Sequence, residues 1–92
     1  MRIVVASKAR DDLAAAVGYI AKDNPAAAAR LLGRIREIVT LLAEGGLDGP
    51  RSTLRSGLEV HSWPIPPLRI YYRRERNAFH ILRIYHQSRR PL

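Results

Sequence analysis

An apolar stripe with a marked beginning and end constrains the fold of this chain more than any other feature. Asn24 followed by Pro25 is typical of a helix start, and Gly45-Gly46 is typical of a helix end. The apolar residues between them recur at helical spacing: Ala28, Leu31, Leu32, Ile35, Ile38, Val39 and Leu42. The segment is therefore predicted to be an amphipathic helix whose apolar face needs another layer to cover it.

A second helix is predicted directly before this one. It would begin near Ser7, which can act as an N-cap, and end near Lys22-Asp23. Asp11 and Asp12 suit its first turns. Its apolar positions are Ala9, Leu13, Ala16, Val17 and Ile20. Because the link between the two helices is very short, they should form an antiparallel hairpin.

The remaining segments indicate strands. Residues 2–6 are a short β-like run, and residues 45–57 are a polar connection rich in Gly and Ser, predicted to be the most mobile internal segment. Further β-like runs cover residues 58–65, 68–73 and 78–86. A turn at residues 74–77 joins the last two runs, and such short links predict antiparallel pairing. Because this length supports one core, we expect a single α+β domain over residues 1–92, ordered β-α-α-β-β-β, with the helical hairpin packed on a small, largely antiparallel sheet.

Alternation along the strands sorts their side chains into two faces. The face predicted to be covered by the helices carries Leu68, Ile70, Leu82 and Ile84. The face predicted to be uncovered carries Arg69, Tyr71, Arg73, Arg83 and Tyr85, and by the same alternation also Phe79 and Ile81. Arginine interleaved with tyrosine suits a nucleic acid or an acidic peptide, through guanidinium charge and ring stacking. Ordinary cross-strand pairing on a solvent-exposed face explains the pattern equally well.

Arginine supplies nearly all of the net charge of +8. Residues 51–92 contain nine Arg and no Lys, against the two acids Glu59 and Glu75, which places +7 of the charge in this half. An anionic partner is therefore expected, either a nucleic acid or an acidic protein segment. A surface that serves only solubility is the alternative.

The residue types that the chain lacks narrow its chemistry. It has no cysteine, which excludes disulfides, thiolate metal sites and a Cys nucleophile. No carboxylate is placed to complete a metal site with His61, His80 and His86, so neither a metal nor a cofactor is expected. The sequence shows no secretory signal and no apolar run near the ~20 residues of a membrane span, so a cytoplasmic location is expected.

Local patterns along the chain together match one known family. Asp12-Leu13 and Tyr19-Ile20 mark the first helix, Arg69-Ile70-Tyr71-Tyr72 marks a central strand, and His86 with Arg89 forms a His-x-x-Arg ending. In this order they resemble the RelE/ParE superfamily of type II toxins, on its ParE side, over nearly the whole chain. The resemblance implies the fold predicted above. It also implies a cognate ParD-like antitoxin that neutralises the toxin in a hetero-oligomer by wrapping an extended, partly helical tail around it.

ParE-like members of this superfamily act on DNA gyrase, which would require a shaped basic surface and no catalytic pair. The residues then expected to contact the target are Arg69, Tyr71, Arg73, Arg83, Tyr85, Arg89 and Arg90. The residues expected to contact the antitoxin are Leu31, Ile35, Trp63, Arg69 and Arg83. The antitoxin tail should be acidic and amphipathic, so that it covers apolar surface and pairs with arginine.

RelE-like members cleave mRNA in the ribosome, which requires an acid, a base and cations for the phosphorane charge. The residues available for this chemistry are His86, Arg69, Arg89 and Tyr85. The RelE lysines are missing, and Glu59 and His61, expected on the uncovered face, are the further candidates for an acid or base. A plain nucleic-acid-binding module is a third alternative, although the chain shows no recognition helix, zinc pattern or RRM-type aromatic motif. Of these three activities, gyrase inhibition requires the fewest specific residues, so it is the activity that we expect.

Overall fold

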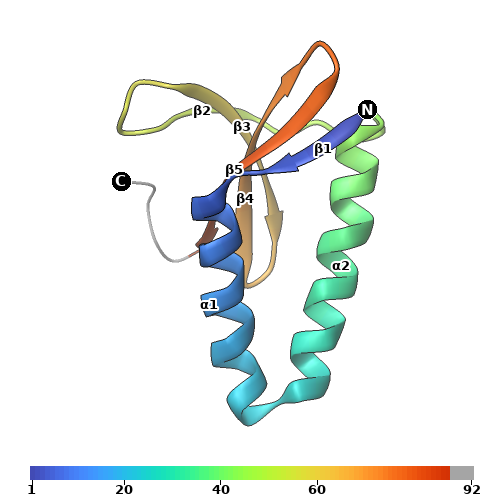
Figure 1. Cartoon of the computed structure of the whole chain (residues 1–92), viewed down its shortest axis with the longest axis vertical. Helices are drawn as coiled ribbons and strands as arrows, with labels where there is room; N and C mark the ends of the chain where they lie inside the picture. The colour runs from blue at the N-terminus through green and yellow to red at the C-terminus, as the bar shows by residue number, and fades with distance from the viewer. Residues whose placement is uncertain (88–92) are drawn as a thin grey trace.

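The computed structural model describes residues 1–87 as two layers, a helical hairpin and a β-sheet (Figure 1). The elements along the chain are β1 (Arg2–Val5), α1 (Ser7–Asp23), α2 (Pro25–Ala43), β2 (Arg51–Thr53), β3 (Glu59–Ile65), β4 (Leu68–Glu75) and β5 (Ala78–His86). Within this described range, neither helix is both long and apolar enough to cross a membrane. The predicted helical hairpin and the α+β class are confirmed.

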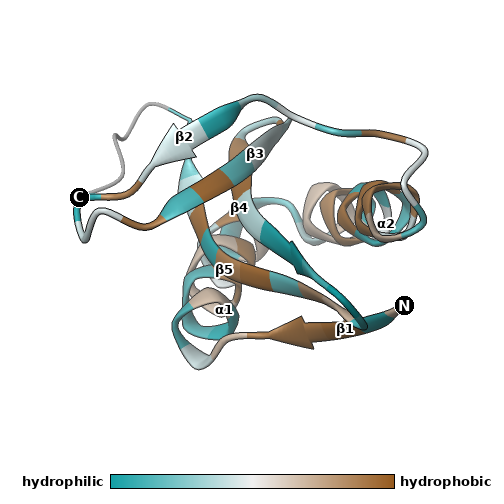
Figure 2. Cartoon of the chain, turned by 90° about the horizontal axis from the view of Figure 1, so that it is seen from above, coloured by the Kyte–Doolittle hydropathy of each residue, from teal (hydrophilic) through white to brown (hydrophobic). Residues whose placement is uncertain are grey.

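The sheet has five strands in the order β1-β5-β4-β3-β2, which Figure 2 shows from the bottom of the view to the top. β1 pairs with β5 in parallel, and the other pairs are antiparallel. The predicted order of elements is confirmed with one addition, because β2 lies in the connection that was predicted to be mobile and pairs with β3. Its three residues are too few to give an alternating pattern, so the sequence alone does not reveal this strand.

The helix ends follow the sequence signals closely at α2 and less closely at α1. The Asn24 side chain accepts a hydrogen bond from a backbone N–H of the first turn of α2 at 3.0 Å, as expected of an N-cap. Beyond the other end, Gly45 has a φ of 83°, a left-handed conformation that glycine adopts without strain. Ser7, predicted to cap α1, is instead its first helical residue, and the cap position is Ala6, whose side chain has no acceptor.

The core lies between the helical hairpin and the sheet. α2 buries Ala28, Leu31, Ile35, Val39, Leu42 and Ala43. The sheet contributes Ile65, Leu68, Ile70, Tyr72, Phe79, Ile81 and Ile84. α1 adds the buried Ala9 and the partly buried Leu13, Ala16 and Ile20. Burial of each large aliphatic side chain stabilises the fold by roughly 1.5–3 kcal/mol, so this contact fixes which face of the sheet is left uncovered.

A β-bulge in β5 overturns part of the predicted assignment of faces. The register between β4 and β5 shifts between Tyr71 and Tyr72, which leaves Leu82 as an extra residue on β5. Leu82, predicted to face the helices, is only partly buried and lies outside the core. Two residues that were predicted to lie on the uncovered face are part of the core instead, namely Phe79 and Ile81. The prediction for the covered face is confirmed for three residues, Leu68, Ile70 and Ile84.

Candidate target-binding surface

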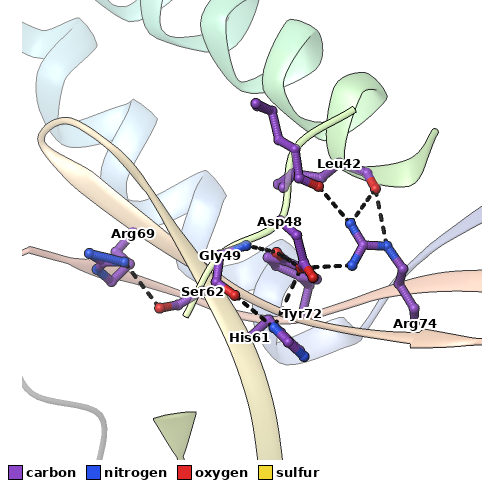
Figure 3. Close-up of polar contacts among 9 residues, drawn as sticks. Leu42, Asp48, Gly49, His61, Ser62, Arg69, Tyr72 and Arg74 are labelled. Carbon is purple, nitrogen blue, oxygen red and sulfur yellow. Dashed lines mark hydrogen bonds and ion pairs between the residues drawn. The ribbon is translucent and has the colours of Figure 1, made fainter. Parts of the chain in front are cut away.

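The uncovered face of β4 presents two arginines. Arg69 and Arg73 lie four residues apart on this strand and alternate with core residues. Arg69 Nη1 donates a hydrogen bond to Ser62 Oγ of β3 at 3.0 Å, which holds its guanidinium against the sheet (Figure 3). The side chain of Arg73 forms no hydrogen bond or ion pair with any residue in the part of the chain that the structure describes. Its donors are therefore available to a ligand.

Tyr71 lies between these two arginines, but only 5% of its surface is exposed. Its ring meets the ring of Tyr85 edge to face, with the centroids 5.4 Å apart. Burial raises the pKa of Tyr71, although the charge of Arg69 opposes this, so the hydroxyl stays protonated at neutral pH. Tyr71 was predicted to contact the target, but it offers little surface for contact. The partly exposed Tyr85 is the more accessible ring.

Arg83 is paired with Asp12 of α1 and is not free on the uncovered face. Its Nε and Nη2 donate to the two carboxylate oxygens of Asp12 at 2.8 and 3.0 Å, and Ile84 N donates to Asp12 Oδ2 at 3.0 Å. Burial opposes ionisation of Asp12, but the Arg83 and Ile84 hydrogen bonds and the charges of Arg83 and Lys8 outweigh it and lower the pKa of Asp12. The Arg83 guanidinium also lies 4.6 Å from the centroid of the Tyr85 ring. Arg83 thus ties α1 to β5.

The pairing of β4 with β5 separates the residues considered for RNA cleavage. Tyr85 lies opposite Arg69, and His86 lies opposite Leu68. Residues paired across a sheet share a face, so Tyr85 lies on the side of Arg69, whereas His86 lies on the side of the core residue Leu68. His86 and Tyr85 nevertheless both line one groove beside α1, whereas Arg69 does not line it. Two predicted contacts in the tail fall outside the described residues, namely Arg89 and Arg90.

The groove beside His86 runs between α1 and the end of β5 and has a volume of about 610 Å³. Its apolar lining consists of Ala15, Ala16, Ile20, Pro67, Leu68 and Ile84. Tyr19, which also lines it, is 75% exposed, and Asp12 and Arg83 contribute charge to its wall. The groove therefore offers an apolar wall beside an ion pair, which suits a partner with one apolar and one polar side.

The residues predicted to contact an antitoxin are distributed differently. Leu31 and Ile35 are 1% and 7% exposed, because they form part of the core between α2 and the sheet. A partner cannot reach them on the folded chain. Trp63 on β3 is partly buried and packs against the same core. Arg83 is the member of the predicted set that lines the groove.

A polar cluster that the sequence reasoning missed ties the segment after α2 to the sheet (Figure 3). Arg74 donates hydrogen bonds to Leu42 O, Leu47 O and Asp48 Oδ1, with distances from 2.7 to 3.2 Å. The hydrogen bond from Arg74 lowers the pKa of Asp48, although partial burial opposes this shift. The sequence reasoning placed Arg74 in a turn. Alternation from Leu68, continued along β4, would have placed Arg74 on the covered face.

Tyr72, His61 and Gly49 complete this cluster. The Tyr72 hydroxyl donates to Asp48 Oδ1 at 3.0 Å and accepts from Gly49 N at 2.8 Å. His61 stacks on Tyr72, and its Nδ1 lies 2.7 Å from Gly49 O. A Cβ atom on Gly49 would collide with the backbone carbonyl of Ser62, so glycine is required for this close approach. His61 therefore faces the segment after α2, and its predicted place on the uncovered face is wrong.

Comparisons with known proteins place this geometry in a family. The family model described as the ParE toxin of the type II toxin–antitoxin system parDE matches residues 3–91. Among solved structures, a chain from the "Chromosomal ParDE TA system from P. aeruginosa" is similar, with a TM-score of 0.74 and 23% sequence identity over 94% of this chain and 95% of that chain. At this identity the structural likeness supports the fold alone. No curated protein matches the sequence.

Proposed function

Because the chain belongs to the ParE toxins of type II toxin–antitoxin systems, we propose that it inhibits bacterial DNA gyrase, and thus replication, and that a ParD-like antitoxin neutralises it. Both partners would meet the toxin in the cytoplasm, and the antitoxin would hold it in a hetero-oligomer. Inhibition would be a binding event, in which the toxin performs no chemistry of its own.

The observation that carries this proposal is a basic surface without an assembled catalytic set. Arg69 and Arg73 share the uncovered face of β4, whereas His86 and His61 lie on the side of the core residues of β4. A general acid and a general base must both come within hydrogen-bond reach of one substrate. Among the described residues, His86 lines the groove beside α1, whereas Glu59 and His61 line a separate cleft. His86 therefore does not share a site with the other two candidates, and the surface suits binding better than RNA cleavage.

The groove between α1 and β5 supports the antitoxin half of the proposal. Its apolar wall and the exposed ring of Tyr19 suit the apolar side of an amphipathic helix or an extended segment. The excess of arginine in the second half of the chain suits acidic side chains on the same segment. We expect the antitoxin to fill this groove, with its carboxylates near Arg83.

Toxicity is the first expected outcome. Production of the intact chain alone should arrest bacterial growth, and co-production of the cognate antitoxin should restore it, because the antitoxin would cover the toxin's surface. The measurement is the number of viable cells after induction, with and without the antitoxin gene. Harmless production of folded chain at high level would count against the toxin activity itself.

The target is tested with purified toxin in two assays, supercoiling by gyrase and cleavage of mRNA on translating ribosomes. We expect inhibited supercoiling and intact mRNA. Arg69→Gln combined with Arg73→Gln should raise the inhibitory concentration roughly tenfold or more, because each lost charge-assisted hydrogen bond costs about 1.5–3 kcal/mol. The matched control is Arg30→Gln with Arg36→Gln, which removes the same charge from exposed positions on α2. Codon-phased cuts in the mRNA together with unaffected supercoiling would identify the translating ribosome, and not gyrase, as the target.

A further inference from the structure

A second basic feature lies where β3 and β4 separate. Their pairing ends at His61 and Tyr72. Beyond this pair, β3 continues beside β2 and β4 continues beside β5, so two hairpins diverge like the arms of a fork (Figure 1). A cleft of about 300 Å³ lies in the fork, and its lining residues are Arg51, Glu59, Val60, His61, Arg73 and Arg74. We call it the fork cleft.

The fork cleft carries a strong excess of positive charge. Three guanidinium groups face one carboxylate, that of Glu59. The side chains of Arg51 and Arg73, one from each arm, form no hydrogen bond or ion pair with residues 1–87, so all their guanidinium donors are available. Arg74 is paired with Asp48 and bonded to backbone carbonyls, so the unpaired positive charge of the cleft comes from Arg51 and Arg73. Planar guanidinium groups with free donors are well suited to the oxygens of a phosphate.

We propose that the fork cleft binds a phosphate group of a nucleic-acid strand. Arg73 lines the cleft and also lies on the uncovered face of β4, which it shares with Arg69. The two arginines are four residues apart, which corresponds to about 13 Å at a rise of about 3.3 Å per residue. Beside Arg69, the partly exposed ring of Tyr85 is available for stacking. A line of cations that continues from a cleft along a strand fits a polyanion with repeated charges better than a single carboxylate.

Glu59 gives the proposal a distinctive consequence. Its carboxylate is the one that lines the fork cleft, the residue is exposed, and the side chain forms no hydrogen bond or ion pair within the described residues. Its negative charge opposes a bound phosphate at short range. Removal of this charge should therefore strengthen binding, an effect that damage to the fold cannot imitate.

The proposal goes beyond gyrase inhibition, because it concerns direct contact between the toxin and nucleic acid, and its test contains no gyrase. The full-length chain is titrated into fluorescent single-stranded DNA or RNA of about 12 nucleotides, and anisotropy is followed at several salt concentrations. Arg51→Gln with Arg73→Gln should weaken binding by roughly tenfold and reduce the log–log salt slope by about 0.7, the value for one phosphate of a single strand. Glu59→Gln should tighten binding by about two- to threefold.

Two controls separate the fork cleft from general charge and from misfolding. Arg30→Gln with Arg36→Gln removes the same net charge from α2 and should change the affinity by less than about threefold. Arg51→Lys with Arg73→Lys keeps the charge and should retain the salt slope while losing part of the affinity, because lysine lacks the guanidinium fork. Circular dichroism of each variant confirms that the chain is folded.

Several outcomes would overturn the proposal. If Arg51→Gln with Arg73→Gln loses no more affinity than Arg30→Gln with Arg36→Gln, binding depends on overall charge and not on the cleft. If neither Arg51→Gln with Arg73→Gln nor Glu59→Gln changes the affinity, the cleft takes no part in binding. Tighter binding of a poly-glutamate peptide than of either oligonucleotide, lost with Arg51 and Arg73, would assign the cleft to an acidic protein. Oligonucleotide binding that follows the prediction without gyrase inhibition would support the cleft and refute only the gyrase target.

Discussion

Two ion pairs of the same chemistry, Asp12–Arg83 and Asp48–Arg74, hold different parts of this molecule together. Each has its shortest N–O distance at 2.8 Å. The Asp12 side chain is 18% exposed, whereas that of Asp48 is 56% exposed. Water screens exposed charges, so the attraction between the two charges should contribute more to stability in the Asp12–Arg83 pair than in the Asp48–Arg74 pair. At the second pair, the hydrogen bonds that Arg74 donates to backbone carbonyls should matter more than its contact with Asp48.

The first pair replaces a missing strand neighbour. β1 ends at Val5, which pairs with Ile81, so no strand formed by residues 1–87 lies beside the rest of β5 on that edge. Asp12 of α1 accepts from Ile84 N on this edge and from the Arg83 side chain. A helix side chain thus satisfies the backbone of a strand, and the same edge forms one wall of the groove. Loss of the pair should loosen α1 against β5.

The second pair closes the end of a helix. α2 has no basic residue in its last turn, where a positive charge is favourable. Arg74 supplies that charge from β4 and satisfies Leu42 O, a carbonyl at the end of the helix. It also lies over the Tyr72 ring, 5.4 Å from its centroid. Loss of Arg74 should therefore free the segment after α2 and expose several acceptors together.

The largest effect on stability is expected from Arg74→Met, which keeps an apolar stem but removes every donor. It should lower the free energy of unfolding by roughly 2–4 kcal/mol, because Leu47 O loses the Arg74 donor and, among residues 1–87, Leu42 O keeps only Gly45 N. Urea denaturation measures the change, with Arg76→Met in the exposed turn as the control. A loss no larger than that of the control would mean that water replaces the Arg74 donors at little cost.

A smaller effect is expected from Asp12→Asn, which removes the charge but keeps an oxygen as acceptor. The free energy of unfolding should fall by roughly 1–2 kcal/mol, because Arg83 is left without its counter-charge. Asp11→Asn is the control, since Asp11 is exposed and its side chain forms no hydrogen bond or ion pair within residues 1–87. Hydrogen exchange at Ile84 N should become faster in the Asp12 variant alone. Equal exchange in both variants would contradict the role of Asp12 at the edge of β5.

The pH dependence of the same variant tests whether charge is the cause. The pKa of Asp12 in the folded chain is lowered from its ordinary value of 3.8, so its contribution to stability is fully present above that value. The contribution is lost as the pH falls through the lower, folded-state pKa. The stability difference between the wild type and Asp12→Asn should therefore be constant near neutral pH and shrink progressively below pH 3.8. A difference that persists in strong acid would show that geometry, not charge, carries the effect.

The sequence predicts the elements of this fold far better than the contacts of its polar residues. Asn24-Pro25 and the apolar stripe of α2 are local signals, and both are confirmed. The bulge at Leu82 is invisible to alternation, because it depends on how β5 pairs with β4. The partners of Arg83 and Arg74 lie 71 and 26 residues away along the chain at Asp12 and Asp48, so no local pattern could name them. Counting charge identifies a basic surface but does not show which arginines remain free on it.

The smallest effects compare two neighbouring tyrosines on β4. Tyr72→Phe removes the hydroxyl that bridges Asp48 and Gly49, and it should lower the free energy of unfolding by about 1 kcal/mol. Tyr71→Phe keeps the ring that packs against Tyr85 and should change stability by less than about 0.5 kcal/mol. Thermal and urea unfolding measure both changes.

Gyrase inhibition by the same two variants distinguishes a tyrosine that only stabilises the sheet from one that also contacts the target. We expect both variants to inhibit gyrase as the wild type does, because Tyr71 is 5% exposed and the Tyr72 hydroxyl is already bonded to Asp48 and Gly49. A loss of inhibition with Tyr71→Phe, at unchanged stability, would restore Tyr71 as a target contact. In that case its hydroxyl would act directly, and the surface available to the target would extend beyond Arg69 and Arg73.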